Sequence, residues 1–169
     1  GGSVPNHKLT FLVAFSLLAT VSVSATEPDT YPRRIGIDIE NYRFEITLSD
    51  QVDEIIGRAT VSVSFTSNGV NVLPLDLTSL NDEGQGMHVL AVYTSESSLS
   101  FVHEDDLLTI DLPEVGQVGS RIAITIEYQG VPDAGLRIGP NKYGDRTFFS
   151  DNWPNRARSW LPTIDHVYE

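Results

Sequence analysis

The sequence predicts an all-β fold, built as an antiparallel sandwich or a large curved sheet. Apolar and polar residues alternate in several short segments, which is the pattern of a strand with one buried face and one solvated face. Clusters of turn-forming residues separate these segments. After residue 25, no stretch carries a helical apolar stripe longer than two turns. A hydrophobic content of 40% with 9% aromatic residues excludes a fully disordered or collagen-like chain.

The expected strands follow one another along the chain. Alternating apolar residues define segments at Ile35–Ile39, Tyr42–Leu48, Ala59–Phe65, Leu108–Leu112 and Ile122–Tyr128. Two shorter apolar runs, at Val70–Leu77 and Met87–Tyr93, fill the gaps between them. Turns are expected at Asp50–Asp53, Ser67–Gly69, Asn81–Gly86, Glu104–Asp106 and Pro113–Gly119. Short strands separated by turns in this way are typical of antiparallel sandwiches.

The first 25 residues predict a secretory signal peptide, which leaves a mature domain at 26–169. Leu9–Ala25 is an apolar run that follows His7 and Lys8 and ends in small residues. The alternative is a membrane anchor, but the strongly apolar part is shorter than the about 20 residues that span a bilayer. We therefore expect no stable membrane span. We expect export to the periplasm, the cell envelope or the medium, because a cysteine-free exported chain suits a bacterial envelope.

The charge of the chain limits the classes of partner that it is expected to bind. Lys and Arg number 11 against 23 Asp and Glu, which gives a formal net charge of −12. This excess argues against nucleic acid as a partner and against adsorption to anionic membranes. The absence of cysteine excludes disulfides, thiol nucleophiles and cysteine-ligated zinc.

The last third of the chain differs from the rest in charge and in aromatic content. Residues 26–120 hold four Arg and 17 acidic residues, whereas residues 121–169 hold six residues of each sign. The last third also contains Tyr143, Phe148, Phe149, Trp153, Trp160 and Tyr168. Aromatic residues interleaved with Arg are typical of interfaces and pocket walls. The alternative interpretation is a solvated acidic face followed by an ordinary stretch.

No complete catalytic or metal-binding motif is present. His103-Glu104 resembles the start of the zinc motif HExxH, but Leu107 stands where the second histidine belongs. His103 is therefore expected to be a half-exposed strand residue. The acidic stretch Glu104–Asp106, with Asp111, lacks the Gly and the closing Glu of an EF-hand, and a solvated turn is expected there.

A specific resemblance lies in residues 135–168. Its matching features are Gly135-Leu136, Phe148-Phe149-Ser150-Asp151, Trp153-Pro154, Arg156-Ala157-Arg158, Trp160-Leu161-Pro162 and Asp165-His166. In this order and spacing they resemble the end of the N-terminal domain of the aminopeptidase N family of zinc metallopeptidases, the gluzincins. The preceding strands, from Arg33 onward, agree in pattern, so the resemblance covers the mature chain.

The resemblance implies a saddle-like β-domain that caps a separate, thermolysin-like catalytic domain. In the family the zinc motif and its general base lie later in the chain. The resemblance therefore implies a C-terminally incomplete domain, a fragment whose full-length parent holds the zinc and hydrolyses peptides. No catalytic residue and no metal ligand are expected in this part. The implied partners are the downstream catalytic domain of the same chain and the peptide substrate of the parent.

The resemblance also implies a site. In the family a Gln or Glu near Ser150–Pro154 helps to bind the amine of the peptide N-terminus, and Trp153 stands at that position. An indole offers a cation its face, worth about 0.5–2 kcal/mol, and Asp151 is two residues away. Asp151 and Trp153 are therefore the candidate cleft-wall residues, with packing as the alternative role of Trp153. The remaining motif residues are expected to be structural: Arg156, Arg158, Trp160, Asp165 and His166.

Two functions from different classes follow. The first is the non-catalytic N-terminal domain of an exported zinc metallo-aminopeptidase, which shapes the cleft that admits peptide N-termini for hydrolysis of the first residue. The alternative is a non-catalytic envelope β-sandwich that binds a peptide, a sugar or a protein partner. The coding sequence beyond Glu169 separates them, because HExxH followed by a later Glu favours the peptidase and a stop codon favours the module.

Overall fold

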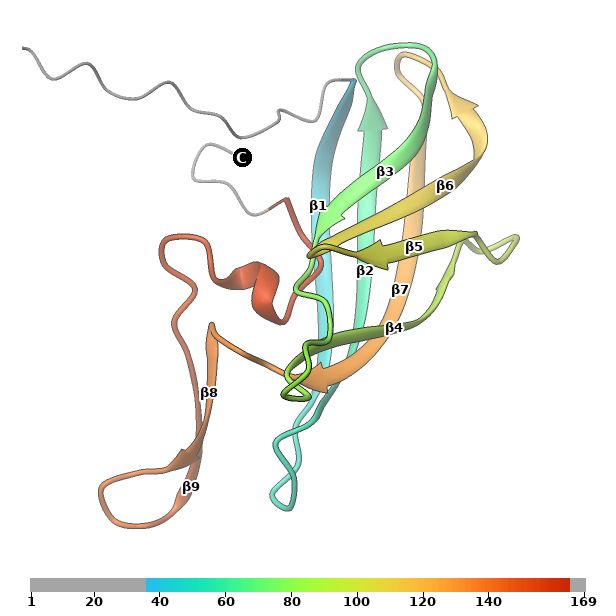
Figure 1. Ribbon diagram of the computed structural model, residues 1–169. Coiled ribbons are helices and arrows are strands. Elements are labelled where there is room, and N and C mark those ends of the chain that lie inside the picture. Colours follow the sequence, from blue (N-terminus) through green and yellow to red (C-terminus); the bar gives the residue numbers. More distant parts are fainter. Residues whose placement is uncertain (1–35, 165–169) are drawn as a thin grey trace, which may run out of the picture. The chain divides into compact units, whose positions relative to one another are not determined.

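The computed structural model describes residues 36–164, which form two antiparallel sheets that share one core, and a hairpin (Figure 1). The strands are β1 (Ile37–Thr47), β2 (Ile55–Phe65), β3 (Val70–Asp76), β4 (Gly86–Tyr93), β5 (Phe101–Glu104), β6 (Leu107–Gly116), β7 (Arg121–Val131), β8 (Leu136–Pro140) and β9 (Arg146–Ser150). A single turn of 3-10 helix, Ala157–Ser159, follows β9. The predicted all-β, antiparallel fold is confirmed. The predicted signal peptide, residues 1–25, lies outside the described residues.

The chain crosses repeatedly between the two larger sheets. The four-stranded sheet has the order β1-β2-β7-β4, and the three-stranded sheet has the order β3-β6-β5. Side chains of both sheets meet in one core, which includes the fully buried Val61, Leu75, Ile110 and Ile126. Strands β8 and β9 form a two-stranded sheet of their own. Among residues 36–164, no helix has the length and apolar character needed to cross a bilayer.

Strand β1 joins two segments whose apolar residues alternate in opposite phase. The apolar positions are odd at Ile37 and Ile39 and even from Tyr42 onward. Ile39 of β1 pairs with Val63 of β2, and Asn41 pairs with the adjacent residue of β2, Ser62. Glu40 therefore has no partner residue on β2. This β-bulge returns the apolar side chains to the inner face. The two strands predicted here are therefore one strand with a bulge.

The other differences from the predicted strands have local causes. Strands β8 and β9 were not predicted, because each has only five residues, too few to show a clear alternation. Of β5, only the strand position of His103 was predicted. The turn predicted at Pro113–Gly119 is wrong over its first half, where β6 continues to Gly116. Opposite β3, Val70 pairs with Gly116 and Val72 pairs with Asp111, so the Pro and Gly of this stretch mark a bulge.

The segment Asp76–Ser79 joins the sheets to the last part of the described chain. Asp76 and Thr163 exchange two backbone hydrogen bonds, with N–O distances of 2.7 and 3.2 Å. The N–H of Thr78 donates to the carbonyl of Arg158 at 2.8 Å. We call Asp76–Ser79 the junction segment, because it fastens the end of the described chain to strand β3.

The junction segment also holds the β5–β6 turn. The N–H of Leu77 donates to the carbonyl of Asp106 at 3.0 Å, and Nε2 of His103 lies 2.8 Å from the carbonyl oxygen of Leu77. The N–H of Ser79 donates to the carboxylate of Asp106 at 2.9 Å. His103 is half-buried in β5, as predicted, and the two residues of its turn, Asp105 and Asp106, have φ values of 51° and 61°.

Gly57 makes room for the largest side chain of the core. Tyr128 is fully buried and is the cross-strand neighbour of Gly57. A Cβ atom at Gly57 would lie 2.2 Å from Cζ of Tyr128, so only glycine fits beneath the ring. Burial raises the pKa of the Tyr128 phenol, which keeps this side chain neutral in the core.

Substitution of Gly57 by alanine tests this packing. We expect Gly57→Ala to lower the free energy of unfolding by about 1–3 kcal/mol, because the buried ring must move in a close-packed core. Urea unfolding followed by circular dichroism measures the loss. Gly139→Ala is the matched control, since a Cβ at this β8 position meets no atom within 4 Å. Similar losses in both variants would contradict the packing argument.

His103 predicts a pH dependence of stability. Burial lowers the pKa of His103, and this effect outweighs the Leu77 hydrogen bond and the charge of Asp106, which raise it. The unfolded chain therefore takes up a proton at a higher pH than the folded chain does, so stability falls as the pH falls below about 6.5. We expect His103→Gln, which does not titrate, to make this fall shallower. Urea unfolding between pH 7.5 and pH 5 measures the slope, and Arg43→Gln on the exposed face of β1, which adds or removes no group that titrates in this range, is the control. An unchanged slope in His103→Gln would refute this assignment.

Candidate functional site

The candidate site is the loop Asp151–Ile164, which follows the β8–β9 hairpin. Asp151 is the first residue after β9, and its N–H donates to the carbonyl of Gly135 at 2.7 Å. Nη1 of Arg156 lies 3.0 Å from Oδ2 of Asp151 and forms an ion pair with it. The N–H of Arg156 binds the carbonyl of Asn152 at 2.9 Å. Arg156 thus holds the Asp151 carboxylate at a partly exposed position, and its structural role stays a prediction.

Trp160 forms the inner side of this loop. Its ring packs against the hydrophobic core, and its Nε1–H donates to Oδ1 of Asn152 at 2.9 Å. Gly135 lies against the ring, with a φ of +75°, and a Cβ there would lie 3.0 Å from the indole and 2.3 Å from the carbonyl oxygen of Arg156. Both the backbone angle and the close approach require glycine. These contacts agree with a packing role for Trp160, which stays a prediction.

Trp153 behaves differently from Trp160. It is 75% exposed, so packing within the described part of the chain is not its role. Asp151 and Trp153 thus belong to one solvent-facing stretch, at the end of which the chain turns inward to Trp160. A carboxylate and the face of an indole are both groups that attract an ammonium ion. The two candidate cleft-wall residues therefore lie on the same partly exposed stretch of the loop.

The rest of the motif fastens the loop to the sheets. The carbonyl of Arg158 accepts the N–H of Thr78, and the N–H of Ile164 donates to the hydroxyl of Tyr42 at 2.9 Å. The backbone of Arg158 thus takes part in anchoring the loop, and the predicted structural role of its side chain stays a prediction. Asp165 and His166 lie outside the described residues, so their predicted role stays a prediction.

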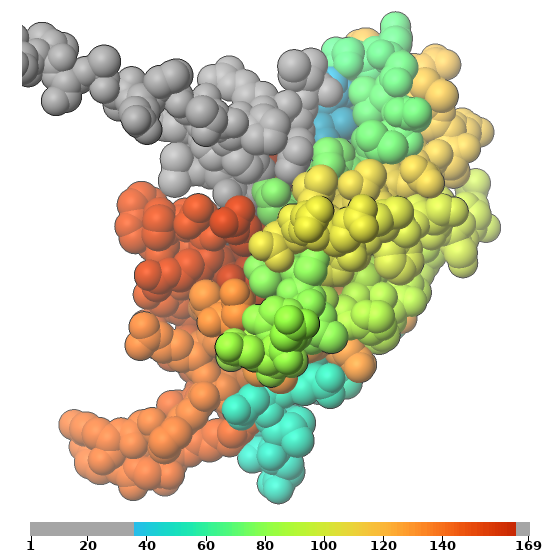
Figure 2. Space-filling view, viewed as in Figure 1, coloured from blue at the N-terminus to red at the C-terminus, as the bar shows by residue number. Residues whose placement is uncertain are grey.

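The β8–β9 hairpin presents two different faces. On one face Ile138, which packs against the core, pairs with the half-buried Phe148. On the other face Arg137 pairs with Phe149, which is 64% exposed. Tyr143 at the tip is 77% exposed. Figure 2 shows the hairpin, in orange, and the β1–β2 turn, in cyan, at the same lower end of the domain.

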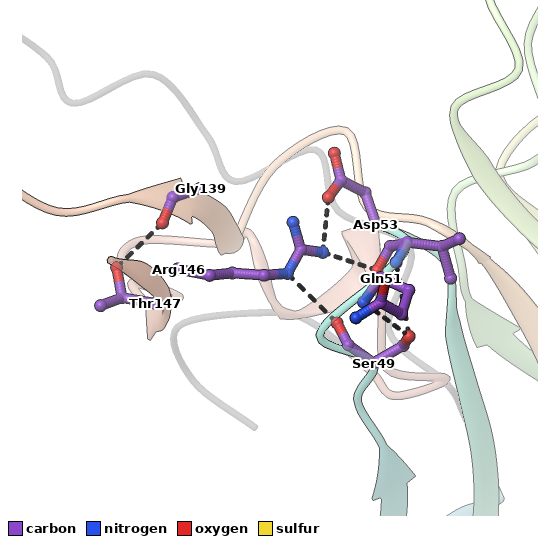
Figure 3. A network of polar contacts seen from close by, with 7 residues as sticks. Ser49, Gln51, Asp53, Gly139, Arg146 and Thr147 are labelled. Atoms are coloured by element: carbon purple, nitrogen blue, oxygen red, sulfur yellow. Dashed lines mark hydrogen bonds and ion pairs between the residues drawn. The ribbon is translucent and has the colours of Figure 1, made fainter. Parts of the chain in front are cut away.

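Arg146 ties this hairpin to the β1–β2 turn. Its Nε donates to the carbonyl of Ser49 at 3.2 Å, and its Nη2 donates to the carbonyl of Val52 at 2.6 Å and to the Asp53 carboxylate at 2.7 Å (Figure 3). The guanidinium carbon also lies 5.6 Å from the ring centroid of Phe148. Sequence reasoning missed this residue, because nothing local to Arg146 signals contacts with a turn more than ninety positions earlier.

A groove of about 680 Å³ lies beside these elements. Its lining includes Asp53 of the β1–β2 turn, Gln85, residues 131–138 and Arg156. We call it the hairpin groove. Because Arg156 both lines the groove and binds Asp151, the groove adjoins the candidate site.

A second polar cluster lies on the outer face of the four-stranded sheet. The hydroxyl of Tyr93 and Nη2 of Arg58 both donate to Oε1 of Glu127 at 2.9 Å. These two hydrogen bonds lower the pKa of the Glu127 carboxyl. The cluster is a satisfied ion pair between neighbouring strands and holds no reactive group. Within residues 36–164, no group of three or more His, Cys, Asp or Glu could hold a metal ion.

Comparison with solved structures places the fold in a known class. An M1 zinc metallopeptidase from Deinococcus radiodurans superposes with a TM-score of 0.62 and 21% identity, over 78% of this chain and 29% of that chain. Its E323A mutant bound to a Tyr-Ser-Ala substrate gives a TM-score of 0.61 and 22% identity, with 78% and 30% covered. Native leukotriene A4 hydrolase from Saccharomyces cerevisiae gives 0.62 and 18%, with 77% and 21% covered. The sequence matches no protein-family model and no curated protein.

These likenesses define the class of fold. The chain has the fold of the N-terminal region of M1 zinc metallopeptidases, as its resemblance to the aminopeptidase N family implied. The chain spans less than a third of the length of the structures that it matches. At these identities the likeness establishes the fold alone, and it does not assign the activity of the relatives to this chain.

The two tryptophans predict contrasting effects of substitution. Trp160→Phe is expected to lower the free energy of unfolding by about 1–2 kcal/mol, because it removes the hydrogen bond to Asn152 and part of a packed ring. Trp153→Phe is expected to change it by less than about 0.5 kcal/mol, because the ring is exposed. Urea unfolding measures both, and acrylamide should quench the fluorescence of Trp153 more strongly than that of Trp160. A larger loss for Trp153→Phe would overturn the assignment of the two rings.

Proposed function

We propose that this chain is the non-catalytic N-terminal domain of an exported zinc metallo-aminopeptidase, where it forms one wall of the cleft that admits peptide N-termini. The observation that carries the proposal is the likeness in fold to M1 zinc metallopeptidases over 78% of the chain. The segment that resembles the aminopeptidase N family forms a well-anchored loop, which is the second support. Export rests on the signal-like Leu9–Ala25 run and the absence of cysteine.

Within this proposal the loop binds the positively charged amine of the substrate. Asp151 supplies a carboxylate, which the ion pair with Arg156 holds in place. Trp153, 75% exposed, supplies a ring face to the same cation. A peptide with a blocked N-terminus lacks this charge, so the loop selects free N-termini.

The zinc of such an enzyme belongs to another part of the parent protein. The described residues do not fit a zinc site, because they offer no group of three His, Cys, Asp or Glu in reach of one ion. Hydrolysis is therefore not assigned to residues of this chain. Their contribution is binding and access.

The exposed aromatic residues of the hairpin and the loop support a docked domain. Tyr143, Phe149 and Trp153 are each more than 60% exposed and lie within a stretch of eleven residues. Exposed aromatic residues gathered in this way mark an interaction site. The downstream catalytic domain is the partner that the proposal assigns to them.

The second candidate function is a non-catalytic envelope module that binds a peptide, a sugar or a protein. It is favoured by the hairpin groove and the exposed rings, which serve a free-standing binding protein equally well. Fold alone does not decide between the two, because one fold serves many functions.

Hydrogen exchange tests the proposed function. The amides of Tyr143–Thr163 are expected to exchange at least about tenfold more slowly in the full-length parent than in this chain alone, because docking adds burial and local stability. Amides of β2 and β7 serve as the internal control. The full-length protein should also release an aminoacyl chromophore in a zinc-dependent way, while this chain alone should not.

Two outcomes would count against the proposal. Equal protection of Tyr143–Thr163 in both proteins would mean that these residues are not a docking surface. A coding sequence that stops at Glu169 would favour the envelope module, and binding of peptides or sugars to the chain alone would then be the activity to measure.

A further inference from the structure

The β8–β9 hairpin needs an external support to keep its direction. It is a two-stranded sheet with five residues in each strand, and such a hairpin is only marginally stable by itself in water. Its base is held by the bond from Asp151 to Gly135 and by the contact of Gly135 with Trp160. These contacts leave its far end, at Pro140 and Arg146, to be fixed by something else.

Arg146 supplies this support near the tip. Three hydrogen bonds run from its guanidinium to the carbonyls of Ser49 and Val52 and to the carboxylate of Asp53, as Figure 3 shows. The side chain is 27% exposed, whereas that of Arg43, in an ordinary surface ion pair with Glu45, is 71% exposed. A planar guanidinium that makes several charge-assisted bonds is both stronger and more directional than an exposed ion pair.

The turn that receives Arg146 is itself ordered. Oγ of Ser49 accepts the N–H groups of Gln51 and Val52 at 3.1 and 3.3 Å. These bonds set the backbone so that the carbonyls of Ser49 and Val52 both accept from one guanidinium. Arg146 therefore binds a turn whose backbone is already fixed by its own hydrogen bonds.

The same contact joins two sides of the hairpin groove. Asp53 lines the groove from the β1–β2 turn, and Arg137 and Ile138 line it from β8. Arg146 of β9 pairs with Pro140 of β8, and its Nη2 donates to Oδ1 of Asp53 at 2.7 Å. A change in this contact would change the distance between the two sides.

We propose that Arg146 is a positioning residue that sets the width of the hairpin groove by fastening the β8–β9 hairpin to the β1–β2 turn. The expected consequence is that the groove presents a peptide of limited width to the loop around Asp151. This consequence, but not the positioning role itself, rests on the proposed function. Arg146 does not touch the substrate in this proposal. It acts through the position of the hairpin.

The absence of cysteine in the chain allows a direct measurement of this spacing. Gln51→Cys in the β1–β2 turn and Tyr143→Cys at the hairpin tip are both exposed and accept spin labels. Pulsed electron paramagnetic resonance should give a narrow distance distribution in this background. Adding Arg146→Gln should at least double its width.

Three further variants make the measurement specific. Arg43→Gln removes an exposed cation on β1 and should leave the distribution unchanged. Arg146→Lys keeps the charge but not the planar fork, and should give an intermediate width. Asp53→Asn leaves the two carbonyl contacts of Arg146 in place and should also give a distribution of intermediate width. It replaces Arg146→Gln as the test if that variant fails to fold. A narrow distribution in both Arg146→Gln and Asp53→Asn, or equal broadening in Arg43→Gln, would overturn the proposal.

Kinetics of the full-length parent test the consequence separately. Arg146→Gln is expected to change KM for peptides about fivefold or more while kcat for a single aminoacyl chromophore stays within about twofold, and Arg146→Lys should restore part of KM. A broadened distribution with unchanged KM would overturn the role in substrate access. A full-length parent with no aminopeptidase activity would overturn the proposed function, while the spin-label distances would still decide whether Arg146 fixes the hairpin.

Discussion

The short pairing between Asp76 and Thr163 is the constraint on which the site depends. Two backbone hydrogen bonds fasten the end of the described chain to the residue where β3 ends. The N–H of the neighbouring Thr78 donates to the carbonyl of Arg158, and the N–H of Leu77 donates to the carbonyl of Asp106 in the β5–β6 turn. The loop that carries Asp151 and Trp153 is thus anchored to the two-sheet core at a point where three segments meet. The other attachments of the loop are the packing of Trp160 and Ile164, the bonds to Thr78 and Tyr42, and the hairpin before it.

Much of the fold could be predicted from the sequence, because period-two alternation reports directly which face of a strand is buried. The inward residues of β2 and β7, such as Val61 and Ile126, are fully buried as that pattern requires. The pattern fails where a strand changes phase, as at Glu40, since a bulge leaves no separate mark in the alternation. It also fails for β8 and β9, because five residues in each strand are too few to show a clear alternation.

The site could be predicted in part. The family-like motif includes the loop, with the ion-pairing Arg156 and the packed Trp160. The different environments of the two tryptophans could not be predicted from the sequence, because both lie in the same polar segment, each close to a proline and an arginine. The distinction depends on Gly135, more than twenty positions away, which makes room for one ring and not for the other. Arg146 was missed for the same reason, since its three acceptors all lie in the β1–β2 turn.

Charge distinguishes the β8–β9 hairpin from the part of the described chain before it, in a way that suits the proposed docking. On the large sheet, Arg58 and Arg121 pair with Glu127 and Glu40, so the cations there are used within the sheet. The surplus of acidic groups lies in exposed turns, for example at Asp82, Glu83 and Glu96. Such a surface resists association, because covering it would strip water from unpaired carboxylates. The hairpin, by contrast, carries Arg137, Lys142 and Arg146 against Asp145 in the span 136–150, and adds exposed aromatic rings. An interface is strongest where aromatic and Arg side chains gather and unpaired acids are few. The hairpin is therefore the surface at which a partner can bind at the lowest desolvation cost.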